Sequence, residues 1–169
     1  MPMRTVLDAP FDALNPLEQA FAAKVGEDGF FRAEVFGDAT GTGFSYSTGF
    51  WVSTGQPEII MFNMKGEIAH DVFWDMFRLA KGNTPLSLGK STNQVFANRT
   101  AYVFPIAKKF YPDYLGWSRW FYGGDHFPCL QIVWPDCEGV FPWQRRFDSA
   151  QPGGQPDLTE HGWQASLAN

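Results

Sequence analysis

The sequence predicts an α+β fold, with a mostly antiparallel sheet or a partly closed barrel and two or three helices packed on it. Three observations support this class. Short apolar runs with a period of two come in pairs joined by glycine-rich turns, which is typical of hairpins. One segment, 66–82, has the period of an amphipathic helix. Strands and helices do not alternate strictly, so the order of elements does not indicate a doubly wound parallel sheet.

The first helix is expected to begin at Pro16. Asn15 precedes it as a helix cap, and Glu18 stands where its side chain can reach back to the cap residue. Gly26 is expected to end this short amphipathic helix.

The first two strands are expected at 29–37 and 43–52, joined as a hairpin by the glycine-rich turn from 37 to 43. The next run, 58–64, is apolar at consecutive positions, which is typical of a strand covered on both faces. We therefore expect this third strand at the centre of the sheet.

Residues 66–82 form the clearest expected helix, which ends at Gly82. Its apolar side chains recur every three or four positions and its charged side chains lie between them, so one face should pack on the sheet. The remaining expected elements are strands at 86–89 and 94–106, a short aromatic helix at 111–124 and a strand at 127–134.

A single domain is expected over residues 1–148. The chain has 169 residues, 44% of them hydrophobic, which is enough for one core without a metal or a disulfide. From 149 to 169 the sequence loses its periodicity and collects Pro, Gly and Gln. This tail is expected to be exposed or partly disordered, with Trp163 as the residue able to dock.

The charge and hydropathy of the chain exclude some partners. The net charge of −5, without a long basic cluster, argues against nucleic-acid binding. No apolar run is long enough to span a membrane, and the first residues contain Asp and Pro where a secretory signal needs an apolar core. These features predict a cytoplasmic protein with no membrane partner.

The metal-ligating residue types do not form a recognisable site. The three histidines are scattered, and no Cys-x-x-Cys or His-Glu-x-x-His spacing occurs, so no metal is expected. Cys129 and Cys137 are too far apart along an extended segment to bridge, so two thiols without a disulfide are expected.

The segment 134–136, Trp-Pro-Asp, is similar to the mobile acid loop of tyrosine phosphatases. Those enzymes need a cysteine followed at a fixed spacing by an arginine, and neither Cys129 nor Cys137 has one there. Asp136 is therefore expected to serve a turn that ends at Gly139.

Five residues are candidates for ligand binding: Tyr46, Thr48, His126, Gln131 and Trp134. Tyr46, Thr48 and Gln131 are polar groups inside otherwise apolar strands, and pockets combine apolar walls with a few such groups. In one interpretation Tyr46 and Thr48 approach Gln131, with Trp134 as a wall. In the other, strand hydroxyls serve packing and the amide of Gln131 bonds to neighbouring backbone.

Three segments together resemble a known family: FSYSTGF (44–50), PEIIMFNM (57–64) and FYGGDHFPCLQIVWPDCEGVFPW (121–143). This combination, over roughly residues 28–145, resembles the bacterial family of domain of unknown function 4262. The resemblance implies a family without an agreed reaction, and it transfers no catalytic residue to this chain.

Two classes of function remain open on the sequence. The first is a small-ligand or cofactor-binding domain, enzymatic or not. A hairpin followed by a buried strand is similar to the opening of flavin-binding split barrels, but no phosphate-binding pattern specifies a cofactor. The second is a non-enzymatic interaction or homodimer module, because aromatic residues, 17% of this chain, are enriched at protein interfaces.

Overall fold

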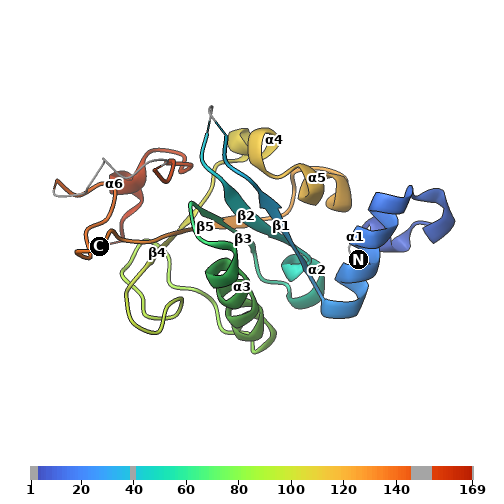
Figure 1. Cartoon of the computed structure of the whole chain (residues 1–169), viewed down its shortest axis with the longest axis horizontal. Helices are drawn as coiled ribbons and strands as arrows, with labels where there is room; N and C mark the ends of the chain where they lie inside the picture. Colours follow the sequence, from blue (N-terminus) through green and yellow to red (C-terminus); the bar gives the residue numbers. More distant parts are fainter. Residues whose placement is uncertain (1–3, 39–40, 146–153, 169) are drawn as a thin grey trace.

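The computed structural model describes residues 4–38, 41–145 and 154–168. In this part of the chain, five strands form one open, mixed sheet in the order β1-β2-β3-β5-β4 (Figure 1). The pairings β1–β2, β2–β3 and β4–β5 are antiparallel, and β3–β5 is parallel. The predicted α+β class with a mostly antiparallel sheet is confirmed, and the sheet is open rather than closed into a barrel.

The strands are short, and the first three follow one another closely along the chain, before β4 and β5. Their bounds are β1 (Phe31–Val35), β2 (Phe44–Thr48), β3 (Glu58–Phe62), β4 (Tyr102–Pro105) and β5 (Cys129–Val133). The third strand, β3, is buried along its whole length and lies at the centre of the sheet, as its continuous apolar run predicted.

The helices cover both faces of the sheet. Their bounds are α1 (Pro16–Asp28), α2 (Phe50–Thr54), α3 (Gly66–Lys81), α4 (Tyr111–Tyr114), α5 (Gly116–Tyr122) and α6 (Trp163–Ser166). Figure 1 shows α3 on one side of the sheet and α4 and α5 on the other.

Alternating side chains of the strands feed two separate hydrophobic cores. On β3, Ile59 and Met61 pack against α3, whereas Ile60 and Phe62 pack against the side of α1 and α5. This alternation follows from the pleat of a strand, which directs successive side chains to opposite faces. A third, smaller cluster joins Phe104 and Val133 to Trp163 of the C-terminal segment.

Local sequence signals fix the two long helices. Asn15 accepts the N–H of Glu18, and the Glu18 side chain accepts the N–H of Asn15, so the predicted capping box is confirmed. The prediction that Gly26 ends α1 is wrong. The helix continues to Asp28, and Gly29 ends it with a left-handed φ of 93°. The prediction that Gly82 follows the last turn of α3 is confirmed.

Three other expected elements differ in the structure. The strand expected at 43–52 stops at Thr48, and α2 begins at Phe50. No strand forms at 86–89, where the N–H of Gly89 makes a single bond to the carbonyl of Val103. The strand expected at 94–106 is limited to β4, and the helix expected at 111–124 is divided into α4 and α5.

Candidate functional site

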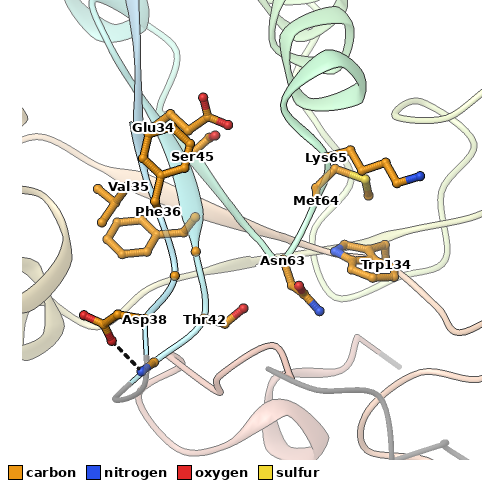
Figure 2. A pocket seen from close by; sticks show the side chains of 14 residues that line it. Glu34, Val35, Phe36, Asp38, Thr42, Ser45, Asn63, Met64, Lys65 and Trp134 are labelled. Carbon is orange, nitrogen blue, oxygen red and sulfur yellow. Dashed lines mark hydrogen bonds between the residues drawn. The ribbon is translucent and has the colours of Figure 1, made fainter.

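A large cavity lies beside the β1–β2 hairpin. It has a volume of about 810 Å³ and opens between the hairpin, the connection from β3 to α3, and the residue after β5 (Figure 2). We call it the hairpin cavity. It is lined by residues 34–38, 41–45, 63–65 and 134. A second cavity of about 710 Å³ lies against the same hairpin and also contains Phe62, Tyr114 and Gln155.

Backbone geometry shapes the hairpin wall of this cavity. A Cβ atom on Gly43 would lie 2.9 Å from the carbonyl oxygen of Val35, and one on Gly37 would lie 2.8 Å from the nitrogen of Gly43. Side chains at these two positions would push the strands of the hairpin apart. The glycines therefore let the two strands of the hairpin stay close together.

Asn63 connects β3 to α3 at the opposite side of the cavity. Its φ is 55°, in the left-handed region that few residues other than glycine and asparagine adopt. Its N–H donates to the carbonyl of Gly43 at 2.9 Å, which ties this turn to the hairpin. A backbone conformation of this kind is found often at ligand sites.

Trp134 forms an apolar wall beside Met64. Its indole N–H donates to the carbonyl of Phe62 at 2.8 Å, and its backbone N–H and carbonyl both bond to the amide of Gln155. These three bonds fix the indole, which is half-buried and lines the cavity. A wall held in this way can contact a ligand without losing further conformational freedom.

Charged groups of both signs lie around the hairpin cavity. Lys65 follows Asn63 on the α3 side, and Glu34 and Asp38 lie on the hairpin (Figure 2). Arg32 donates to the hydroxyl of Ser45 at 2.9 Å and lies 3.8 Å from the carboxylate of Glu34. The cavity thus combines apolar walls with carboxylates, a hydroxyl, an amide and an ammonium group.

The opposite end of the sheet holds a buried carboxylate, Glu58. It accepts the backbone N–H groups of Gly49, Phe50 and Trp51 at 2.9, 3.1 and 3.2 Å. The hydroxyl of Ser47 donates to it at 2.7 Å. The phenol of Tyr122 also donates to it. Glu58 therefore caps the first turn of α2 from a different strand, which explains why a helix replaces the expected end of the second strand.

Burial controls the protonation of this cluster. Desolvation raises the pKa of Glu58, and the bonds from Tyr122, Ser47 and the α2 backbone oppose this shift in part. The pKa of Tyr122 is raised as well, first by burial and then by the carboxylate beside it. Glu58 is fully buried and lines none of the described cavities, so its position supports a structural role.

The polar strand residues of the predicted site are bonded within the protein. Tyr46 and Gln131 lie in one row across the sheet, but Ile60 of β3 stands between them. The hydroxyl of Tyr46 accepts the N–H of Trp117 at 3.0 Å, and the hydroxyl of Thr48 bonds to that of Ser118 at 2.7 Å.

The amide of Gln131 donates to the carbonyl of Pro156 at 2.8 Å. This contact agrees with the interpretation in which the amide serves the backbone. Its carbonyl oxygen, Oε1, is buried and has no hydrogen-bond partner among the residues that the structure describes.

His126 and Trp134 lie at different ends of β5, one before its first residue and the other after its last. His126 is exposed and stacks edge-on against Trp51, near the Glu58 end of the sheet. Trp134 lines the hairpin cavity. The five predicted residues therefore do not line one described cavity together. Of the five, Trp134 lines the hairpin cavity.

Asp136 forms a turn, as predicted. Its side chain accepts the N–H groups of Glu138 and Val140 at 2.9 Å each, and its carbonyl accepts the N–H of Gly139. No disulfide joins Cys129 and Cys137; burial raises the pKa of the Cys129 thiol, which keeps it protonated.

Within residues 4–38, 41–145 and 154–168, no cluster of His, Cys, Asp and Glu has the arrangement of a metal site. In the same part of the chain, none of the helices has the length and apolar character needed to cross a lipid bilayer.

Sequence reasoning missed Asn63, Lys65 and the glycines of the hairpin as cavity residues. A signal was present in the sequence Phe-Asn-Met-Lys-Gly, because asparagine just after a buried strand is typical of a left-handed turn. Glu58 gave no such signal, because its partners come from segments that are distant in the sequence.

These features define an α+β protein with an open mixed sheet and a cavity beside its first hairpin. The family model "Domain of unknown function (DUF4262)" matches residues 24–148, most of the chain. The protein belongs to this family. Neither the curated proteins nor the solved structures contain a significant match to it.

Proposed function

We propose that this protein binds a small molecule in the hairpin cavity. The observation that carries the proposal is the cavity itself, whose volume of about 810 Å³ lies within the range of small-molecule sites. Its apolar walls with a few polar groups are the usual composition of such sites. The proposal concerns binding and assigns no reaction to the cavity.

The chemistry of the walls favours an amphipathic ligand. A flat apolar part fits against Trp134 and Met64, where indole and thioether surfaces offer dispersion contacts. Polar groups of the ligand meet Asn63, Lys65 and the carboxylates of Glu34 and Asp38. Charges of both signs around one cavity suit a ligand that is itself zwitterionic.

Native mass spectrometry combined with a screen of small zwitterionic and aromatic metabolites tests this proposal. We expect bound mass above the 19.1 kDa chain, or hits that raise the unfolding temperature. Lys65→Glu reverses the charge of one wall and Thr42→Trp fills the cavity, so both variants should weaken binding by at least about tenfold. Lys90→Glu makes the same charge change at an exposed residue outside the cavity lining and should leave binding unchanged.

The proposal fails if the screen finds no ligand by either measurement. It fails equally if a ligand binds with the same affinity to Lys65→Glu, Thr42→Trp and the Lys90→Glu control, because that ligand would occupy another site.

A further inference from the structure

The residues of β1 are complementary to the same residues of a second, antiparallel copy of the strand. β1 is an end strand of the sheet and pairs with β2 on one side within the described residues. Its second backbone edge is open to pairing with another strand. Two large apolar side chains at its end are exposed, Val35 to 40% and Phe36 to 81%. Exposed apolar residues beside an open strand edge are typical of a protein interface.

The sequence of β1, Phe-Arg-Ala-Glu-Val, is symmetric in character about Ala33. If two copies pair antiparallel with Ala33 opposite Ala33, Arg32 of each copy lies opposite Glu34 of the other. Phe31 of each copy lies opposite Val35 of the other. Opposite charges and apolar pairs are the cross-strand neighbours that stabilise antiparallel sheets.

The same register also gives the exposed Phe36 a position to occupy. Phe36 of one copy lies opposite Phe30 of the other, next to a hollow of about 150 Å³ between α1 and α3. Of the rings that line this hollow, Phe31 and Trp74 are half-buried, whereas Phe30 and Phe73 are buried. The most exposed large apolar side chain of the described residues would thus meet the accessible part of Trp74.

We propose that a second copy of this chain pairs with β1 about a two-fold axis at Ala33 and forms one continuous sheet. In such a pairing, side chains that face each other across the two strands lie on the same side of the sheet. The Arg32 and Glu34 groups of both copies form a set of alternating charges on the face of α3. The interface is isologous, since one surface serves both copies. This inference does not depend on the ligand proposed for the hairpin cavity.

Sedimentation velocity over roughly 1 to 200 μM protein tests the proposed dimer. We expect wild-type protein to sediment with twice the 19.1 kDa mass of the chain at the upper concentrations. Phe36→Asp places a charge in the interface and should give a monomer, while its exposure keeps the fold intact. Phe11→Asp makes the same change at a phenylalanine with 56% exposure away from β1 and should leave the dimer unchanged.

Exchange of the two charges tests the register. Glu34→Arg alone places arginines opposite each other and should weaken the dimer at least about tenfold. Arg32→Glu combined with Glu34→Arg restores the alternation and should recover dimerisation. Wild-type protein that is monomeric throughout the range overturns the proposal. So does a dimer that persists in Phe36→Asp, or one that the single and double charge variants weaken equally.

Discussion

At the scale of single residues, Glu58 connects β2, α2 and α5 through its hydrogen bonds. A carboxylate that accepts three backbone N–H groups and two hydroxyl groups satisfies the first turn of α2 without exposure to solvent. No local pattern predicted it, because the partners lie in β2, α2 and α5.

Gln131 is the opposite case. An amide within an apolar strand has few partners other than backbone, and the bond to Pro156 follows that rule.

Glu58→Gln should destabilise the protein by about 1–3 kcal/mol, because the amide NH₂ group brings two hydrogens toward these donors, one more than a protonated carboxyl group, and leaves a donor unpaired. The cost should depend on pH. Burial raises the pKa of Glu58 above its ordinary value of 4.5, so the folded protein holds this proton where the unfolded chain has lost it. The stability that Glu58 contributes is full below pH 4.5 and is lost as the pH rises through the folded pKa.

Urea unfolding of wild-type and Glu58→Gln protein from about pH 4 to about pH 8 measures this dependence. The other titrating groups cancel in the difference between the two free energies of unfolding. We expect this difference to fall as the pH rises. A difference that grows with pH would mean that the hydrogen bonds outweigh desolvation and lower the pKa of Glu58.

At the scale of elements, the chain turns from β2 into α2 at Gly49. The alternation of rings and small residues continues past Thr48, so the sequence predicted one strand from 43 to 52. The structure breaks this strand because Gly49 has a φ of 125° and Glu58 caps the helix that follows. By contrast, α1 and α3 depend on caps and periodicity within their own sequences, and both were predictable.

Gly49→Ala should destabilise the protein by at least about 3 kcal/mol. A Cβ atom at this position would lie 2.4 Å from the carbonyl oxygen of Gly29 and 2.6 Å from the Cα of Phe30. These backbone atoms cannot move aside without disturbing the end of α1. Thermal or urea unfolding of the variant measures the loss.

Gly26→Ala is the matched control. Gly26 lies inside α1 and has no atom within 4 Å of an added Cβ, so alanine should stabilise the protein by about 0.5–1 kcal/mol through its helix propensity. If both glycine-to-alanine variants changed the free energy of unfolding in the same direction, that result would contradict this account of the β2–α2 turn.

At the scale of the whole molecule, the sequence predicted the α+β class and the central position of β3, but not the parallel pairing of β3 with β5. These strands are separated by α3, β4, α4 and α5, and no short-range signal specifies which distant strand lies beside β3. The hairpin cavity depends on this pairing, because it brings Trp134 next to Asn63 and Met64. Part of the cavity lining was therefore beyond sequence reasoning.

The C-terminal segment also differs from the exposed or partly disordered tail expected for residues 149–169. In its described part, 154–168, Leu158 is 1% exposed and belongs to the core formed with α1 and α5. Gln155 bonds to both backbone groups of Trp134, and Trp163 packs against Trp143. The expected docking of Trp163 is confirmed, whereas the burial of Leu158 was not expected from the composition of this segment. Residues 149–153 and 169 lie outside the described residues.

A chain limited to the family match, residues 24–148, should therefore not fold stably. It lacks Phe21, which is 3% exposed and stacks on Trp117 at 4.7 Å, and it lacks Leu158. Loss of a buried large side chain costs about 2–5 kcal/mol, and a domain of this size has roughly 5–15 kcal/mol of stability in all.

In the full chain, Phe21→Ala and Leu158→Ala should each lower the free energy of unfolding by about 2–5 kcal/mol. Near-UV circular dichroism and thermal unfolding measure both effects, and a cooperative transition of the short chain at the midpoint of the full chain would refute this expectation. The unit that folds is then longer than the family-matched region, because α1 and the C-terminal segment both contribute side chains to the same core.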